Sequence, residues 1–218
     1  LYIVMNNGCY GLTKGQDSAT ADQGSINKSG VENSFQGIDL IGLGLELGAT
    51  FLARSFSGDK SQLIPLIKAG LSHPGFALID VISPCVTFNN NVGSTKSYDY
   101  TREHIEATGS IDLVPYKSEI THSQTDGTTQ VITLHDESSI QVHKLSQDWD
   151  PTSKISAYNK MHEAKTAKEI LTGLIYIDTE SKDLHSVLKT SKKPLNALVE
   201  SDLCPGNDAL AKICAGMR

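Results

Sequence analysis

Short apolar runs alternate with amphipathic stretches through the first hundred residues. Three runs have the length and continuous apolar character of strands buried in a parallel sheet: Leu1–Met5, Thr50–Ser55 and Gly75–Ile82. Between them we expect a buried helix at Ile38–Leu47 and a second helix whose cap is Ser57 or Asp59. Four apolar residues are expected on one face of the second helix: Leu63, Leu66, Ile67 and Leu71. This order predicts an α/β fold, a mostly parallel sheet with helices on both faces.

The second half of the chain has a different pattern. Tyr100–Thr108 is expected to be helical, and Val131–Leu145 has two alternating runs around a polar turn, which predicts a hairpin. A further helix at Lys154–Ile170 and a last strand at Leu171–Ile177 follow. From Lys189 onward the chain is polar and contains prolines, and we expect this tail to lie over a partner surface.

Composition narrows the class of protein. The 218 residues suffice for one domain of ordinary size with a real core, and the net charge of −6 disfavours nucleic acid or an anionic membrane as the main partner. No apolar run approaches the length of a membrane span, and the start lacks the basic region of a signal peptide. The chain has four cysteines: Cys9, Cys85, Cys204 and Cys214. None forms a C-x-x-C pair, which favours a reducing, cytoplasmic location.

Two polar loops follow predicted strands. The first reads NNGCYGLTKGQ, Asn6–Gln16, and the second begins at Ser83-Pro84-Cys85. Both loops leave their strands at the carboxyl edge of the sheet, where ligands gather in folds of this class. We therefore expect one site to receive both loops.

The first loop has the groups needed to hold Mg²⁺ and a diphosphate. The side-chain oxygen of Asn7 and the carbonyl of Cys9 are suitable Mg²⁺ ligands, and Lys14 can meet an anionic group. Three residues between them can hold phosphate through close backbone approach, amides and a hydroxyl: Gly11, Leu12 and Thr13. The residues alone favour a plain turn with a surface loop, and Cys85 alone favours a packed, inert thiol. The cations Arg54, Lys60 and Lys68 could attract an acidic partner or could simply be solvated.

Three stretches carry a family resemblance. NNGCYGLTKGQDSAT, LIDVISPCVTFNN and STKSYDYTREH resemble the thiamine-diphosphate-binding β subunits of 2-oxoacid:ferredoxin oxidoreductases. The hairpin, DWDPTSKISA and KKPLNALVESDL are most similar to the 2-oxoglutarate:ferredoxin branch of that family. The resemblance implies a thiamine-diphosphate-binding fold, with residues 1–110 as the C-terminal part of the PP-type domain. Residues 111–218 would form an extension packed on that domain and on the partner subunit.

The resemblance also implies roles for single residues. Asn7, through its side chain, and Cys9, through its carbonyl, match Mg²⁺ ligands, and Cys85 matches one of four ligands of a [4Fe–4S] cluster. Two further positions match residues that face the substrate: Leu12 and Lys14. Three match residues that hold the diphosphate: Gly11, Leu12 and Thr13. The other three cluster cysteines and the Gly-Asp-Gly motif of the family are absent from the sequence, and the chain opens on Leu1, so we expect that an N-terminal part is missing.

The resemblance implies an enzyme subunit with no proton-transfer residue of its own. The implied reaction is CoA-dependent oxidative decarboxylation of 2-oxoglutarate to succinyl-CoA and CO₂, with electrons passing through the cluster to ferredoxin and an α subunit as partner. A pyruvate or broad 2-oxoacid enzyme is the alternative within the family. A non-catalytic domain that binds a diphosphate or a partner subunit is the alternative from another class.

Overall fold

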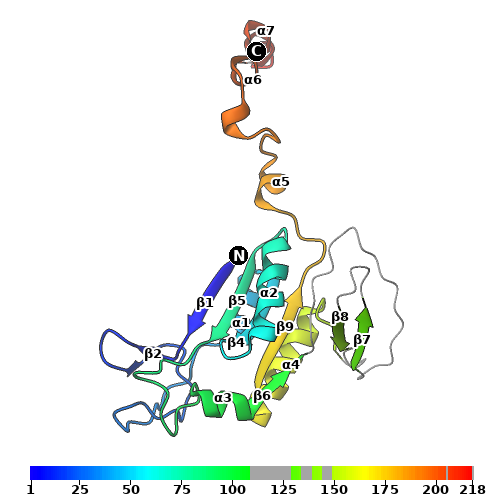
Figure 1. Cartoon of the computed structure of the whole chain (residues 1–218). Helices are drawn as coiled ribbons and strands as arrows, with labels where there is room; N and C mark the ends of the chain where they lie inside the picture. The colour runs from blue at the N-terminus through cyan, green and yellow to red at the C-terminus, as the bar shows by residue number, and fades with distance from the viewer. Residues whose placement is uncertain (109–128, 134–138, 144–148, 205, 218) are drawn as a thin grey trace. The chain divides into compact units, whose positions relative to one another are not determined.

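A computed structural model describes residues 1–108, 129–133, 139–143, 149–204 and 206–217 (Figure 1). The chain divides into two compact units, Leu1–Ser181 and Lys182–Arg218. The first unit contains these elements in chain order: β1 (Tyr2–Asn6), β2 (Cys9–Tyr10), β3 (Gln16–Asp17), α1 (Leu40–Glu46), β4 (Phe51–Phe56), α2 (Lys60–Ser72), β5 (Ala77–Ile82), α3 (Tyr98–His104), β6 (Ile105–Ala107), β7 (Thr129–Thr133), β8 (Ser139–His143), α4 (Lys154–Ala167) and β9 (Ile170–Ile177).

The central sheet has five strands in the order β1-β5-β4-β9-β6. β5 pairs in parallel with β1 on one side and with β4 on the other, and β6 pairs in parallel with β9. β9 is antiparallel to β4. Two short antiparallel pairs, β2–β3 and β7–β8, lie outside this sheet. The predicted mostly parallel α/β fold is therefore confirmed.

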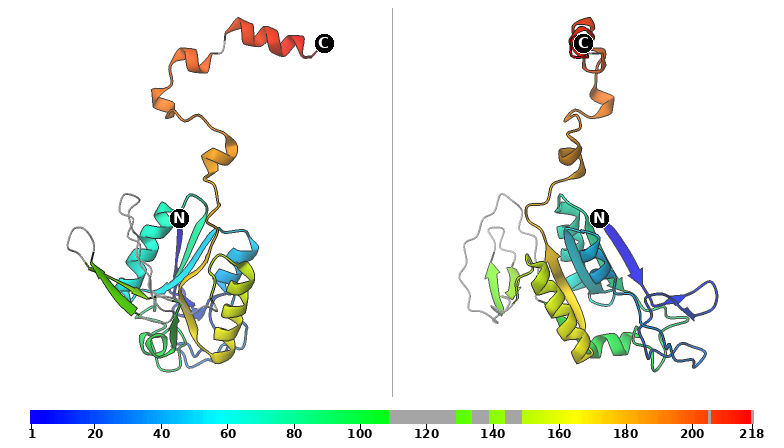
Figure 2. Two further views of the ribbon diagram at one scale, coloured as in Figure 1. Left: turned by 90° about the vertical axis from the view of Figure 1, so that its right-hand side faces the viewer. Right: turned by 180° about the vertical axis from the view of Figure 1, so that it is seen from behind.

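Helices cover both faces of the sheet. Figure 2 (left) shows α2 on one face and α1 with α4 on the other. Because side chains alternate along a strand, Leu52 packs with Ile41 of α1, whereas its neighbour Phe51 packs with Leu66 of α2. Each face of β4 thus contributes to a separate apolar cluster, as expected for a sheet buried on both sides.

Aspartates begin both helices that flank β4. Asp39 Oδ1 accepts the Ile41 amide at 2.9 Å and begins α1, and Asp59 Oδ1 accepts the Gln62 amide at 3.1 Å and begins α2. Asp59, rather than Ser57, is therefore the cap of α2. Leu71, expected on the buried face, is 69% exposed. At 100° per residue it lies about 140° around the helix from the buried Leu66, outside the stripe that faces the sheet.

Two other expectations are corrected. β1 is a strand but not a buried one: Tyr2 and Met5 are each 60% exposed. In the described sheet β1 is an edge strand that pairs only with β5, so much of its apolar surface lacks a covering layer. The helix expected at Tyr100–Thr108 ends at His104, and β6 follows, because its residues pair with β9 instead of continuing the turn.

Several expectations reach beyond the described residues. β7 and β8 pair in antiparallel fashion and confirm the hairpin in its two strands, whereas its turn at 134–138 and Leu145 lie outside the described residues. The boundary near residue 110 also lies outside them and stays a prediction. Among the described residues, no helix is both long enough and apolar enough to cross a membrane.

The second unit consists of short helical segments: α5 (Leu184–Leu188), η1 (Leu195–Ala197), α6 (Glu200–Leu203) and α7 (Asn207–Ala215). None of these helical segments contains a buried residue. Exposed apolar side chains on α7 include Leu210 and Ile213. Contact between this C-terminal tail and a partner subunit stays a prediction.

Candidate cofactor site

The two polar loops meet at the carboxyl edge of β1 and β5. These strands are parallel neighbours, with Asn6 opposite Ile82. Just beyond them, the Ser83 amide donates to the Asn6 carbonyl at 2.9 Å, and Asn89 Nδ2 donates to the Asn7 carbonyl at 2.8 Å. The two loops are therefore adjacent, as expected, and their joint role in one binding site stays a prediction.

The first loop folds into a small hairpin with an exposed tip. β2 and β3 pair, and the turn between them closes with the Lys14 amide donating to the Gly11 carbonyl at 3.1 Å and the Gly15 amide to the Tyr10 carbonyl at 2.9 Å. Lys14 and Gly15 both have positive φ, 71° and 99°. Leu12 is 99% exposed, and no atom lies within 4 Å of a Cβ built on Gly11. Four of the predicted binding residues are therefore adjacent on an open surface: Gly11, Leu12, Thr13 and Lys14.

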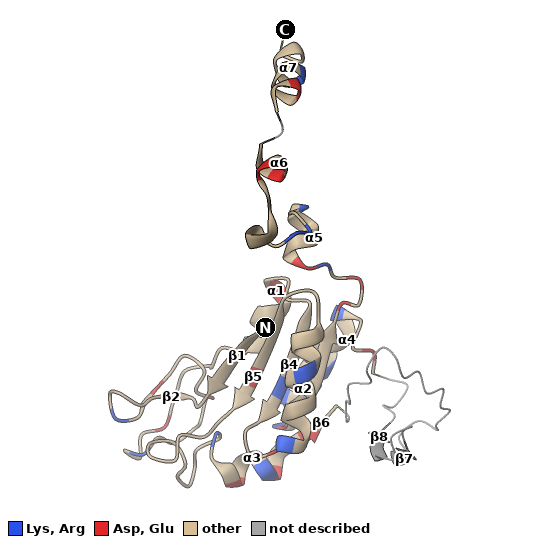
Figure 3. Ribbon diagram, turned by 45° about the horizontal axis from the view of Figure 1, so that its top comes forward, with Lys and Arg blue, Asp and Glu red and all other residues tan. Residues whose placement is uncertain are grey.

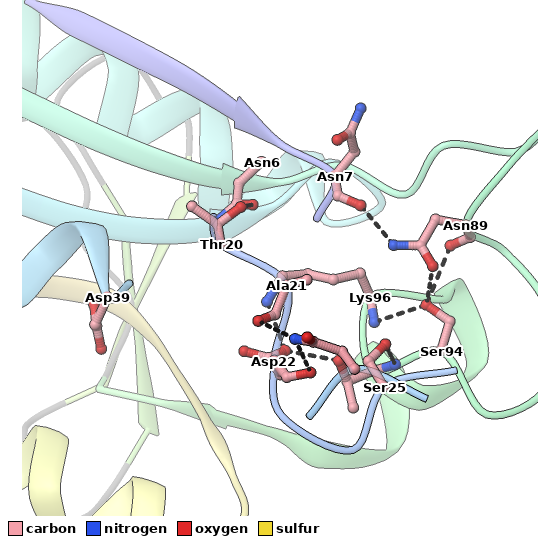
Figure 4. Close-up of polar contacts among 12 residues, drawn as sticks. Asn6, Asn7, Thr20, Ala21, Asp22, Ser25, Asp39, Asn89, Ser94 and Lys96 are labelled. Atoms are coloured by element: carbon pink, nitrogen blue, oxygen red, sulfur yellow. Dashed lines mark hydrogen bonds and ion pairs between the residues drawn. The ribbon is translucent and has the colours of Figure 1, made fainter. Parts of the chain in front are cut away.

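Asn7 lies at the base of this hairpin, half-buried. Its Oδ1 accepts the Cys9 amide at 3.0 Å, which fixes the side chain in a local turn and leaves a second lone pair on the oxygen. Figure 4 shows the side chain of Asn7 directed away from Asn89. Gly8 follows with φ of 67°, and a Cβ there would come within 3.1 Å of Lys96 Cγ and 3.2 Å of Asn89 Nδ2. Glycine is therefore required both for the backbone angle and for the close approach.

An ion pair between a buried lysine and a half-exposed aspartate holds the long loop after the hairpin. Lys96 is 7% exposed, and its Nζ lies 2.7 Å from Asp22 Oδ2, which also accepts from Thr95 Oγ1 at 2.7 Å (Figure 4). Burial acts to raise the pKa of Asp22, but the charge of Lys96 and these hydrogen bonds outweigh it and hold the pKa below its usual value. Within the same loop, the buried Asn33 donates to three backbone carbonyls. The loop is thus fixed by side chains rather than by regular structure.

The thiols of Cys9 and Cys85 lie against each other. Cys9 is 6% exposed and Cys85 is half-buried, and Cys85 lies close enough to affect the pKa of Cys9. Burial and the contact with Cys85 raise the pKa of Cys9 to about 11, so its sulfur stays protonated at neutral pH. From the sequence, a role was assigned to the Cys9 carbonyl alone, and it was not predicted that the two cysteines are neighbours.

The described residues do not fit a four-cysteine cluster by themselves. They contain no group of three or more His, Cys, Asp or Glu side chains placed to hold a metal ion. The other two cysteines, Cys204 and Cys214, are exposed in the second unit. A four-cysteine cluster at Cys85 would therefore need ligands from outside the described residues.

A second charged group lies in the sheet itself. Arg54 Nε lies 2.8 Å from Asp80 Oδ2, and its Nη2 lies 2.7 Å from Asp39 Oδ1. Arg54, named above as a cation that could attract an acidic partner, is thus an internal ion-pair partner. Lys60 and Lys68 are exposed on α2, where Figure 3 shows basic residues in blue.

The donor set at the loop fits a magnesium ion that carries a diphosphate. Asn7 Oδ1 and the Cys9 carbonyl are neutral oxygens two residues apart, of the kind Mg²⁺ prefers. The diphosphate would supply the negative charge, and the open hairpin tip leaves room for it. Asn89, Lys96 and Asp22, which support the loop, were missed by sequence reasoning, because nothing in their local pattern marks a contact with residues 74 or more positions away.

A comparison with protein-family models gives a match over part of the first unit. Residues 1–81 match the thiamine pyrophosphate enzyme, C-terminal TPP binding domain. That stretch contains β1, the first loop and most of β5, which build one side of the site. Over these residues the chain is similar to thiamine-diphosphate-binding domains, and the whole first unit has an α/β fold.

The chain is similar to the β subunits of 2-oxoacid:ferredoxin oxidoreductases, as its motifs predict. It is 39% identical to the 2-oxoacid:ferredoxin oxidoreductase subunit beta of Saccharolobus solfataricus over 54% of this chain and 38% of that subunit. It is 36% identical to the 2-oxoglutarate oxidoreductase subunit KorB of Mycobacterium tuberculosis over 40% of this chain and 24% of that subunit. The chain therefore spans well under half the length of the curated relatives it matches.

A solved structure supports the fold. The 2-oxoglutarate:ferredoxin oxidoreductase from Magnetococcus marinus, solved with 2-oxoglutarate, coenzyme A and succinyl-CoA bound, aligns with a TM-score of 0.57 at 23% identity. The alignment covers 97% of this chain and 57% of the other. At this identity the likeness concerns the fold alone.

Proposed function

We propose that this chain is part of the β subunit of a 2-oxoglutarate:ferredoxin oxidoreductase. The reaction is the CoA-dependent oxidative decarboxylation of 2-oxoglutarate to succinyl-CoA and CO₂, with electrons passed to ferredoxin. The observation that carries the proposal is the meeting of the Asn7 loop and the Cys85 turn at one sheet edge, in a domain that matches thiamine-diphosphate enzymes. An α subunit completes the enzyme, and the cytoplasm stays its expected location.

In this proposal the residues of the chain bind and orient. Thiamine diphosphate supplies the electron-sink chemistry when it is bound. Asn7 Oδ1 and the Cys9 carbonyl would hold Mg²⁺, and the backbone and hydroxyl groups at the exposed tip, Gly11, Leu12 and Thr13, would hold the diphosphate. Lys14 would meet a carboxylate of the substrate, with Leu12 beside it. Cys85 would contribute one ligand to a [4Fe–4S] cluster completed from outside the described residues.

The test uses the complete enzyme, purified anaerobically from its source or coexpressed with its partner subunit. We expect bound thiamine diphosphate, Mg²⁺, iron and sulfide, and CoA-dependent viologen reduction with 2-oxoglutarate. Reduction with pyruvate and not with 2-oxoglutarate would replace the substrate but keep the chemistry. Diphosphate binding without iron and without reduction would favour a non-catalytic diphosphate-binding domain and overturn the proposal.

Lys14→Met tests the substrate contact within this function. Because Lys14 is an exposed cation at the loop tip, its loss should raise KM for 2-oxoglutarate by about tenfold, the equivalent of one charge-assisted hydrogen bond, and leave thiamine diphosphate content unchanged. Lys28→Met is the matched control, since Lys28 is an exposed loop lysine that donates to the Thr87 carbonyl instead. Equal KM in the wild type and in Lys14→Met would remove Lys14 from the substrate site.

A further inference from the structure

Asn89 connects the two loops of the site. Its side-chain Nδ2 donates to the Asn7 carbonyl at 2.8 Å, while its backbone amide donates to the Cys85 carbonyl at 2.8 Å. Asn89 is 4% exposed, so both bonds are shielded from water. One residue thus joins the residue expected to bind Mg²⁺ to the turn that carries the thiol.

The orientation of Asn89 is itself fixed. Its Oδ1 accepts from Ser94 Oγ at 2.7 Å, which commits the opposite end of the amide, Nδ2, to the Asn7 carbonyl (Figure 4). Nδ2 also lies where a Cβ on Gly8 would approach it to 3.2 Å, so the amide packs against the backbone that leads into Asn7–Cys9. Movement of this amide would therefore move the Asn7 backbone.

We propose that Asn89 is a positioning residue for the cofactor: it sets the place of the Asn7 side-chain oxygen and ties it to the Cys85 turn. Asn89 does not touch the cofactor in this account. It acts through the Asn7 carbonyl, and its loss leaves that carbonyl without the donor that fixes the turn. The inference rests on the proposed function, because the ligand of Asn7 is Mg²⁺ with thiamine diphosphate.

The experiment measures binding of Mg²⁺ and thiamine diphosphate to the complete enzyme depleted of both. Asn89→Asp keeps an oxygen that accepts from Ser94 and removes the donor to Asn7, with little change in volume. We expect about tenfold weaker binding of thiamine diphosphate at fixed Mg²⁺, the equivalent of one hydrogen bond made to a fixed partner. At saturating cofactor, kcat per folded enzyme should return close to the wild-type value. The thermal midpoint should fall, because the new carboxylate is buried at a 4% exposed position, so binding is measured below the midpoint of the variant.

The control is Asn91→Asp, two residues further along. Asn91 Nδ2 donates to the Ile26 carbonyl at 2.9 Å and to the Val92 carbonyl at 3.1 Å, and neither acceptor belongs to the Asn6–Gln16 loop, so cofactor affinity should stay at the wild-type value. Asn89 is not a positioning residue if Asn89→Asp binds thiamine diphosphate as tightly as wild type does. The same conclusion follows if binding is lost only in proportion to the folded protein lost and kcat is not recovered at saturating cofactor. Failure of the wild type itself to bind thiamine diphosphate would overturn the proposed function, which is a distinguishable result.

Discussion

Replacement of Arg54 by methionine should strongly destabilise the first unit. Arg54 lies between two carboxylates, and Asp80 is 1% exposed with an Oδ1 that already lacks a hydrogen-bond partner. Without the guanidinium, Asp80 would be a buried charge with no partner. Breaking such a pair costs about 3–5 kcal/mol. With a urea m-value of about 2 kcal/mol/M, the unfolding midpoint should fall by about 2 M.

The double variant Arg54→Met/Asp80→Leu separates charge from packing. Removing both partners of a buried pair is often close to neutral, so the double variant should regain most of the lost midpoint, while Asp39 still caps α1. The measurement is urea unfolding followed by circular dichroism, on wild type and both variants. A single variant within about 0.5 M of wild type, or a double variant no more stable than the single one, would refute this reasoning.

The pH dependence provides a second check on the same charge. In Arg54→Met, Asp80 would be a buried carboxylate without a partner, and burial disfavours its charged form. Protonation relieves this cost, so the deficit in unfolding midpoint relative to wild type should shrink as pH falls. A deficit that stays constant from pH 7 to pH 4 would instead indicate lost packing around the arginine.

Further predictions concern the loops. Gly8→Ala should destabilise the cofactor-free protein by about 1 kcal/mol or more and so lower its unfolding midpoint. The reasons are the Gly8 φ of 67° and the 3.1 Å distance between a Cβ at Gly8 and Lys96 Cγ. Gly11→Ala, with open space around the new Cβ, should leave that midpoint unchanged while weakening thiamine diphosphate binding; equal effects of both substitutions would contradict this assignment. Because the pKa of Asp22 is lowered, its contribution to stability is present above the unfolded pKa of about 3.9 and lost as pH falls through the folded value. Urea midpoints between pH 7 and pH 3 should therefore fall less in Asp22→Asn than in wild type.

The strands, the helices and the site loops were predictable to different degrees. β4, β5 and α2 were found because their apolar periodicity is local, and only Leu71 at the end of the α2 pattern lies outside the buried face. The exposure of β1 was not predicted, because an apolar run does not reveal whether a neighbouring layer covers the strand. β6 was missed because three residues are too few to show a period, and its pairing with β9 is a tertiary contact.

The candidate site shows the same limit. Asn7 and Cys85 could be selected because each follows a strand, and parallel strands end at one edge. The residues that hold them were invisible to this reasoning: Asn89 and Asn7 are 82 positions apart, and Lys96 and Asp22 are 74 apart. Their roles arise only when the loops are brought together, and asparagine or lysine in a polar loop is unremarkable by itself.

The backbone at Lys14 gives an independent reason to place function at the loop tip. Among described residues other than glycine, three have positive φ, and all are lysines: Lys14, Lys168 and Lys189. Lys168 and Lys189 are the C-caps of α4 and α5, where the left-handed conformation is common and satisfies the last carbonyls. Lys14 ends no helix, and glycine would adopt its φ of 71° without the cost of about 1 kcal/mol or more that a side chain brings there. A strained cation kept on an exposed hairpin is accounted for if its charge acts on a ligand, which is the role tested by Lys14→Met.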